Sequence, residues 1–495
     1  MRALPVAVLG CVLCGAAGAE EPLRPRWGEL RLESPIPVDT LAWREALDLG
    51  GRDVDEAPLE PALLRGLRLL AARGYAFAEA RPGSFDLDGN VVTGTIALEP
   101  GTQARVEGLV LEGAKVTRAS TAERLAGVRP GDAYTGVEEE EARERLARSG
   151  LFSSVGEAEI VPGPEPGDVL LKIPVEEPAY TRFGGLLGVS GPESRVTGFL
   201  DLELTNIAGT AREASGRWED RGDGLTRFAL HYREPWIPFV PVGVAGDLEH
   251  DVFEGRYSYT KWEVVGDLGF GPWTFAFGRG GTRAVEVVEA AEEASEDRKV
   301  NERFFVAGIA LDRRNAAANP TRGFRMSLRN RRGSKTLNAA RDSLEIRVDR
   351  NRWEAAAEGY LGLGNRWLVA VGTRFDFLDT PEDSLPRWDL TAVGGATSVR
   401  GYREEQFLAS SVWLVRNEVR WLQDRRGSSL YVLADVGFLN REGRRFADLF
   451  DRVLAGYGVG VRQANRLGIL GVEYAVAKGE SVLDGRIHLR IDAVF

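Results

Sequence analysis

The sequence predicts small α+β domains followed by an all-β transmembrane barrel of about 16 antiparallel strands. Three observations predict this fold class. Residues 27–177 contain two strand, helix, helix, strand, strand patterns, and residues 180–495 contain roughly sixteen segments of alternating side chains with aromatic ends. The long connections between these segments also fall on one side of the predicted sheet.

Residues 1–19 predict a secretory signal peptide. Arg2 precedes the apolar stretch "ALPVAVLGCVLCGAAGA", which is too short to span a bilayer, and small residues precede Glu20. A lipoprotein signal is the alternative, because "VLGC" resembles a lipid-attachment box at Cys11. Cys11 and Cys14 are the two cysteines of the chain, so we expect a mature protein without thiols or disulfides.

Composition argues against several classes of function. The net charge of -11 argues against a nucleic-acid partner. The three histidines, His231, His250 and His488, lie far apart on separate predicted strands, and the acidic loop at 286–299 lacks calcium-ligand spacing. We therefore expect no catalytic residue, no metal and no cofactor, and a protein that is not an enzyme.

Residues 102–177 form the clearer of the two predicted α+β domains. A strand at 104–114 precedes a short helix at 120–131, with Ser120 and Glu123 as a capping box and Pro130-Gly131 as the stop. A longer helix opens on Thr135 and ends on Gly150. A strand pair follows at 155–161 and 169–175.

Residues 20–101 predict a similar domain less clearly. The helix "PLEPALLRGLRLLAARGY" at 58–75 carries leucines on one face, and a strand pair surrounds Gly89-Asn90. The opening strand, near 29–33, has the weakest pattern.

Residues 178–495 predict the barrel. The segments begin near residues 180, 195, 209, 225, 241, 255, 272, 301, 323, 342, 366, 411, 428, 452, 467 and 485. The long connections, at 286–300, 333–341, 378–410, 440–451 and 478–484, all join an odd segment to the next even one. A soluble β-sandwich is the alternative, but such folds rarely segregate long and short loops in this way.

The longest connection, 378–410, contains the stretch "GGATSVRGYREEQF" with Arg400. In the two strands after it, apolar side chains at alternate positions suit lipid, so Glu418 and Asp435 face the barrel interior. A turn at Arg426-Gly427 would place these two carboxylates directly opposite each other, where they repel without a cation between them.

Two interpretations of Arg400 follow from these charges. The loop can fold inward so that Arg400 bridges Glu418 and Asp435, since a guanidinium donates to two carboxylates in fixed geometry. Alternatively, Arg400 is exposed to solvent, and the two carboxylates pair with interior arginines such as Arg416 or Arg420.

"VRGY" in a long loop, Glu418 in the next strand and "ADVG" after it resemble the outer-membrane assembly-factor superfamily. This superfamily, which includes the bacterial surface antigen family, contains BamA-like and TamA-like proteins and two-partner-secretion transporters. The resemblance covers residues from about 104 to the end, and residues 20–100 resemble a POTRA domain less closely. It implies periplasmic POTRA domains before a 16-stranded barrel in the bacterial outer membrane. It also implies a loop lock formed by the residues Val399, Arg400, Gly401, Tyr402, Glu418 and Asp435.

The same resemblance implies a lateral gate where the first barrel strand meets the last. Gly184 and Gly185 would weaken packing at this seam, although they can also serve only to relieve barrel curvature. The ending "RIHLRIDAVF" resembles the assembly signal of outer-membrane barrels, with Ile487, Leu489, Ile491 and Phe495 as its apolar positions.

We therefore expect a factor that inserts or translocates β-rich client proteins through a lateral gate. The expected partners are unfolded outer-membrane or secreted clients, the lipid bilayer and a periplasmic protein, with no nucleic acid. The alternatives are a two-partner-secretion-type transporter for one dedicated protein and a passive porin or receptor. Two POTRA units suit a secretion transporter, but the residues after the signal leave no room for the plug helix that such transporters usually carry.

Overall fold

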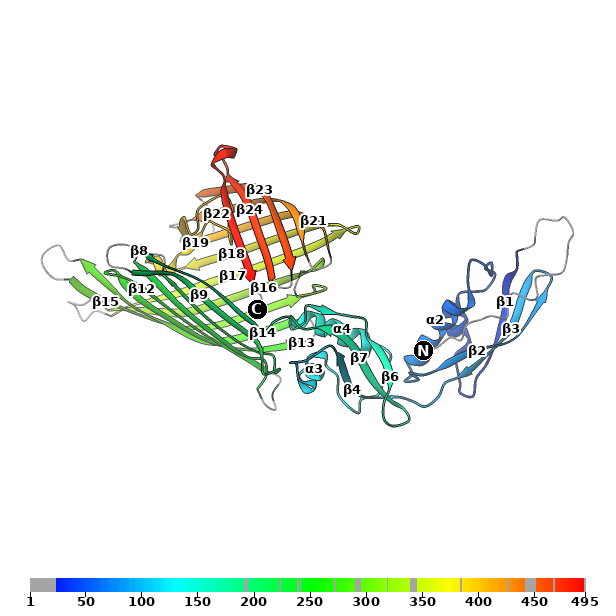
Figure 1. Cartoon of the computed structure of the whole chain (residues 1–495). Coiled ribbons are helices and arrows are strands. Elements are labelled where there is room, and N and C mark those ends of the chain that lie inside the picture. The colour runs from blue at the N-terminus through cyan, green and yellow to red at the C-terminus, as the bar shows by residue number, and fades with distance from the viewer. Residues whose placement is uncertain are drawn as a thin grey trace. The chain divides into compact units, whose positions relative to one another are not determined.

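The computed structural model describes residues 24–190, 195–220, 222, 224–237, 240, 242–270, 273–289, 295–317, 319–338, 345–382, 385–424, 427–440, 451–465 and 468–493. The predicted signal peptide lies outside these residues. The chain divides into two compact units, which meet in the sequence between Glu176 and Glu177 (Figure 1). Among the described residues, no helix is long and apolar enough to cross a membrane.

The first unit begins with a three-stranded sheet in the order β1-β3-β2. Strand β1 runs parallel to β3, and β2 pairs antiparallel with β3. The elements are β1 (Arg26–Glu33), α1 (Thr40–Leu47), α2 (Leu59–Ala71), β2 (Glu79–Asp88) and β3 (Val91–Glu99). The predicted apolar face of α2 packs into one core with Trp27 and Trp43, so the 3.6-residue period of its leucines matches their burial.

The second sheet of this unit has β7 at its centre, parallel to β4 and antiparallel to β5 and β6. Its elements are β4 (Arg105–Glu112), α3 (Ala119–Ala126), α4 (Glu138–Ser149), β5 (Ser154–Val155), β6 (Glu159–Pro162) and β7 (Asp168–Glu176). Val169, Leu171 and Ile173 of β7 are fully buried. Alternate residues of one strand therefore fill the core of this sheet.

The ends of two helices differ from the expectation. Helix α3 begins at Ala119, so Ser120 lies inside its first turn rather than at the cap, and it ends earlier, at the left-handed Gly127 with φ 74°. Glycine takes this conformation without steric cost, which is why it rather than Pro130-Gly131 stops the helix. Helix α4 begins at Glu138, whose carboxylate accepts a hydrogen bond from the Thr135 N–H at 2.9 Å, and it ends at Gly150 as predicted.

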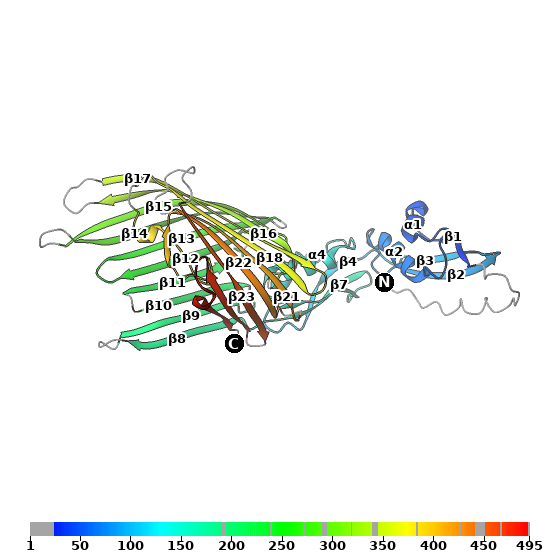
Figure 2. The ribbon, with the colours of Figure 1, turned by 90° about the horizontal axis from the view of Figure 1, so that it is seen from above.

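The second unit is one antiparallel sheet of sixteen strands, which confirms the predicted fold class. The sheet is strongly curved (Figure 1), and its strands lie side by side from β8 on, as Figure 2 shows from above. The strands are β8 (Thr181–Ser190), β9 (Arg195–Ile207), β10 (Arg212–Asp220), β11 (Leu225–Glu234), β12 (Val242–Phe253), β13 (Tyr257–Phe270), β14 (Trp273–Glu289), β15 (Ser295–Asp312), β16 (Arg322–Asn338), β17 (Glu345–Leu363), β18 (Trp367–Asp379), β21 (Ser411–Leu422), β22 (Ser429–Asn440), β23 (Arg452–Asn465), β24 (Gly468–Ala477) and β25 (Arg486–Ala493).

Burial alternates along these strands as the sequence pattern predicts. In β22 the odd residues from Ser429 to Leu439 are buried, whereas Leu430, Val432 and Ala434 are exposed. In β22 the outer face therefore exposes apolar side chains, whereas the inner face holds buried side chains, both apolar, such as Leu433, and charged, such as Asp435. This alternation is typical of a sheet that faces lipid on one side.

Two of the predicted long connections are mostly strand. Strands β14 and β15 extend to Glu289 and from Ser295, and β16 extends to Asn338, so 286–300 and 333–341 are largely paired backbone. Their charged side chains concealed the alternation in the sequence. The long connection after β18 is present, and it contains a 3₁₀ turn η2 (Arg387–Asp389) and the short strands β19 (Thr391–Val393) and β20 (Phe407–Ala409).

The core position Leu171 gives a test of the second sheet. Leu171→Ala removes a fully buried side chain, and we expect it to lower the local free energy of unfolding by about 2–5 kcal/mol. Hydrogen exchange of the β4 and β7 amides in the full-length protein measures this loss. The control is Lys172→Ala on the other face of β7, whose Nζ lies 3.1 Å from Glu112 in an exposed pair, and its exchange should stay near that of the unchanged protein.

Candidate functional site

The connection between β18 and β21, residues 380–410, folds against the inner face of the sheet; we call it the inner loop. Strands β19 and β20 pair with each other and form its stalk, and the tip between them carries the "VRGY" residues. Val399 and Arg400 are fully buried. The alternative interpretation, a solvent-exposed Arg400, is therefore wrong.

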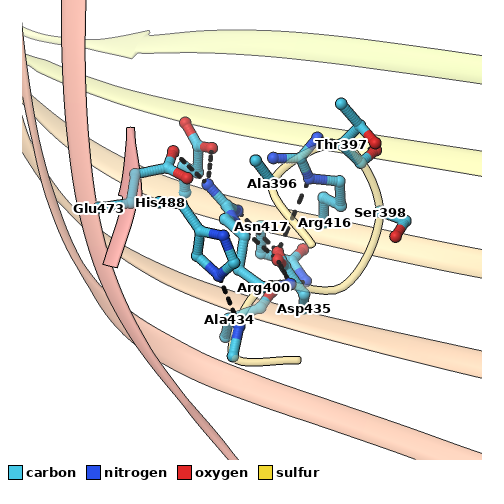
Figure 3. Close-up of polar contacts among 12 residues, drawn as sticks. Ala396, Thr397, Ser398, Arg400, Arg416, Asn417, Ala434, Asp435, Glu473 and His488 are labelled. Carbon is cyan, nitrogen blue, oxygen red and sulfur yellow. Dashed lines mark hydrogen bonds and ion pairs between the residues drawn. The ribbon is translucent and has the colours of Figure 1, made fainter. Parts of the chain in front are cut away.

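Arg400 lies between carboxylates from three strands (Figure 3). Its Nε and Nη2 donate to the two carboxylate oxygens of Asp435, each at 2.7 Å, and its backbone N–H donates to Oδ2 at 3.1 Å. Its Nη1 donates to Glu418 at 2.6 Å and to Glu473 at 2.9 Å. The planar guanidinium thus satisfies the carboxylates of β21, β22 and β24 at once, which an ammonium group cannot do in this geometry.

Glu473 is the member of this cluster that the sequence analysis missed. It is a single carboxylate at an inward position of the otherwise apolar strand β24, and Tyr431 also donates to it at 2.7 Å. The signal that identified Glu418 and Asp435, an acid at an inward alternate position, applies equally to Glu473. Its distance from the loop motif along the chain is what concealed it.

The charges balance only when the neighbouring arginines are included. Arg420 lies 2.7 Å from Glu418, and Arg416 Nε lies 4.0 Å from Asp435. Burial would lower the pKa of Arg400, but its hydrogen bonds to Asp435 and the three negative charges outweigh burial and raise the pKa above its ordinary value. Arg400 therefore stays charged wherever the protein is folded.

The predicted register of β21 and β22 is wrong by two residues. Asp435 lies opposite Arg416, and Glu418 lies opposite Leu433. The connection is longer than the two-residue turn at Arg426-Gly427, since a backbone hydrogen bond from Gln423 to Ser428 closes it. Glu418 and Asp435 still share the inner face because a shift of two residues preserves parity.

The backbone around Arg400 is held as closely as its side chain. A Cβ added at Gly456 of β23 would lie 1.8 Å from the Arg400 carbonyl oxygen, so only glycine leaves room for the loop there. The glycine at this position of β23 therefore supplies space for the loop backbone. Gly401 has φ 95°, a left-handed conformation that favours glycine.

The last strand also holds the motif. The Gly401 N–H donates to His488 Nε2 at 3.2 Å, and Arg486 donates to the Gly401 carbonyl. Both residues lie on the inner side of β25, which is an edge strand of the sheet. The inner loop therefore contacts an edge of the sheet as well as the inner face of its other strands, which we call the wall.

Apolar packing completes the site. Val399 joins a buried cluster with Val412, Leu414, Leu439 and Leu454. Tyr402 packs against this cluster and edge-on against Phe407, with ring centroids 5.5 Å apart. Its hydroxyl donates to the Ala455 carbonyl at 3.3 Å. All the predicted lock residues thus lie together.

The structure places the other predicted site residues at the two edge strands. Gly184 and Gly185 lie in β8, with open space around Gly184 and Leu200 close to Gly185. Ile487 and Leu489 are exposed on β25, and Ile491 pairs with Leu470. Phe495 lies outside the described residues. Among the described residues, no hydrogen bond or ion pair joins a member of either group to Arg400.

The histidines lie apart from one another. His231 contacts Asp247 at 2.8 Å, His250 contacts Thr260 at 2.9 Å, and His488 contacts Gly401. Across the described ranges, no group of three or more His, Cys, Asp or Glu side chains is placed to hold a metal ion.

Comparison with known proteins relates this architecture to one family. The family model of the Omp85 superfamily domain matches residues 206–495, more than half of the chain, and a POTRA model, the surface antigen variable number repeat, matches residues 104–177. BamA from Haemophilus ducreyi lacking POTRA domains 1-3 is similar, with a TM-score of 0.55 and 16% identity over 94% of this chain and 98% of that chain. CdiB from Escherichia coli has a TM-score of 0.50 and 14% identity over 97% of this chain and 90% of that chain. Both likenesses show the fold.

Removing the central cation tests the site. Arg400→Ala leaves three carboxylates facing one another, and breaking such a buried pair costs about 3–5 kcal/mol. We expect a lower unfolding midpoint in urea, followed by tryptophan fluorescence in detergent, and rapid proteolysis of the inner loop. Arg403→Ala, which removes an exposed arginine of the same loop, is the matched control. Equal behaviour of the two variants would contradict the buried role of Arg400.

The space at Gly456 gives an independent test. Gly456→Ala places a methyl group against the Arg400 carbonyl, so we expect it to displace the loop tip and to raise its protease sensitivity. Gly359→Ala in β17 is the matched control, because nothing lies within 4 Å of a Cβ added there. If the loop of the Gly456→Ala variant resists protease as well as the loop of the Gly359→Ala variant, the close approach of the backbone at Gly456 is not what positions the loop tip.

Proposed function

Because the chain belongs to the Omp85 superfamily, we propose that it is a bacterial outer-membrane assembly factor that inserts β-rich client proteins. The observation that carries this proposal is the pair of edge strands, β8 and β25, at the two ends of the sixteen-stranded sheet. An edge strand presents backbone N–H and C=O groups that an incoming client strand can pair with.

The proposed cycle needs no cofactor and no covalent chemistry. Every backbone polar group in a bilayer must be paired, so a client strand that pairs with β8 or β25 crosses the membrane at lower cost than an unpaired strand. Gly184 and Gly185 favour release of this seam, since glycine contributes no side-chain packing to the β8 edge. Backbone pairing and burial of apolar side chains in lipid would then drive insertion.

The first unit has a matching role in this proposal. In the POTRA-matched sheet, residues 104–177, β4 lies at an edge of the sheet order; its first residues also hydrogen-bond to the segment 131–134, and its later residues pair with β7. In the periplasm this edge can receive an unfolded client by adding its strand to the sheet. The chain would then deliver the client to the membrane-embedded edges.

The inner loop would regulate access to the seam. The Gly401 backbone is hydrogen-bonded to the side chains of His488 and Arg486 of β25. A loop that lies against the inner face, which we call seated, therefore holds this edge strand in place. A client that displaces the edge would have to compete with these contacts. The proposed resting state is therefore one with Arg400 seated among its three carboxylates.

A disulfide between β8 and β25 tests whether the seam between these strands must open for insertion. The variant Gly185→Cys combined with Leu489→Cys places a thiol on each edge strand, both on the exposed face. We expect oxidation to abolish insertion of a β-barrel client into liposomes and a reductant to restore it. Each single variant is the control. Full insertion by the cross-linked protein would refute insertion through this seam.

Depletion tests the class of client. We expect depletion of this protein to lower the abundance of several outer-membrane barrels, measured by proteomics of the outer membrane. Loss of a single secreted protein, with all barrels retained, would instead identify a dedicated export transporter. Unchanged barrels and unchanged secretion would indicate a passive porin or receptor.

A further inference from the structure

The base of the inner loop carries a second set of ion pairs, opposite in sign to those at its tip. Asp389, in the turn η2, accepts hydrogen bonds from Lys335 Nζ and Arg350 Nη1, both at 3.0 Å. Glu382 accepts from Lys335 Nζ at 2.8 Å, and its other oxygen lies 3.5 Å from Arg350 Nε. We call Glu382 and Asp389 the acidic anchor and Arg400 the basic anchor.

The wall that receives the acidic anchor is basic and closed to solvent. Lys335 of β16 is 2% exposed and Arg350 of β17 is 5% exposed. Arg350 Nη1 also donates to a carboxylate of the sheet itself, Glu302 of β15, at 3.3 Å. Two buried cations beside one wall carboxylate carry excess positive charge, and the loop supplies the negative charge that balances it.

Further contacts fix the loop base in the same place. Trp388 packs edge-on against Tyr257 of β13, with centroids 4.8 Å apart, and stacks on Tyr259 at 6.2 Å. Arg352 of β17 donates to the Thr391 hydroxyl at 2.6 Å and to the Asp389 carbonyl at 3.3 Å. The turn before β19 is therefore attached to three wall strands, β13, β16 and β17.

We propose that the acidic anchor is a second positioning element of the inner loop and that the two anchors of opposite charge select a single seating of the loop. An exchanged seating would place Asp389 beside Asp435 and Arg400 beside Lys335. Like charges in a buried site repel strongly, so the exchanged arrangement is excluded. Apolar packing alone does not distinguish the two arrangements in this way.

The charge state of Asp389 agrees with this role. Burial would raise the pKa of Asp389, but the positive charges of Arg350 and Lys335 and their hydrogen bonds lower it below its ordinary value. Asp389 is therefore ionised when the loop is seated. The stabilisation that this charge gives is fully present above the unfolded-state pKa of Asp389 and is lost as the pH falls through the lower folded-state value.

The position of Asp389 has a consequence for the edge strand β25. The loop is held at its base by β13, β16 and β17, and at its tip by β21, β22, β24 and β25. The acidic anchor therefore helps to keep Arg400 and Gly401 against β25. Any effect on client insertion depends on the proposed function, whereas the position of the loop itself does not.

A disulfide trap measures the seating of the loop tip without any client. A Cβ added at Gly437 lies 2.8 Å from Val399 Cγ2, so Val399→Cys with Gly437→Cys should cross-link when the loop is seated. Cys11 and Cys14 are replaced by serine in every variant, which leaves the trap pair as the two thiols.

We expect Asp389→Lys to slow cross-linking by about fivefold or more, as for coupled sites. Lys335→Glu should slow it as well, and the combined charge swap, Asp389→Lys with Lys335→Glu, should restore most of the rate. The matched control is Asp267→Lys, which breaks an inner-face pair with Arg233 at 2.9 Å and should leave the rate unchanged. Heat-modifiable gel mobility checks that each variant is folded.

If Asp389→Lys does not fold, Glu382→Gln with Asp389→Asn provides a milder loss of charge and should also slow the trap. An unchanged trap rate in a folded Asp389 variant, or a charge swap that restores nothing, would overturn the acidic anchor. Either result would leave the assembly proposal intact, because the trap is read without client. Normal trapping with failed insertion would contradict the assembly proposal instead.

Discussion

The inner face of the sheet depends on one buried guanidinium. Asp435 and Glu473 are almost completely buried, and Glu418 is mostly so, and they lie on three different strands of the sheet. Three carboxylates in such a site are stable only with a cation among them, and Arg400 is the cation that contacts all three. The inner loop is therefore held against the inner face of the sheet, and the loop and the sheet each supply charges that balance the other's.

This constraint explains features that are otherwise unrelated. Glycine at 456 makes room for the loop backbone, and glycine at 401 permits the turn after Arg400. His488 and Arg486 hydrogen-bond to that same turn from the edge strand. The same hydrogen bonds therefore hold both the loop tip and β25 in position. They connect the site to the seam at which clients are proposed to enter.

Much of this could be predicted from the sequence because alternation and parity are local properties. The strand starts and the inward direction of Glu418 and Asp435 follow from which residues share a face, whereas alternation left two interpretations of Arg400 open. Strand register was not accessible, since the turn after β21 is longer than its glycine suggested and moved Asp435 opposite Arg416. Glu473 and the pairing of Asp389 with Lys335 join residues far apart in the chain, and their partners depend on how the sheet curves. The charged ends of β14, β15 and β16 have the appearance of loops in the sequence because their side chains hide the alternation.

Hydrogen exchange at the loop tip tests the central claim most directly. The Arg400 amide donates to Asp435 and the Gly401 amide donates to His488, and both lie in a buried segment. In the full-length protein in lipid nanodiscs, these amides should exchange as slowly as those in the middle of β21 and β22. Exchange as fast as in the exposed turn at 481–484 would show that the loop is not seated on the wall, and would contradict the account.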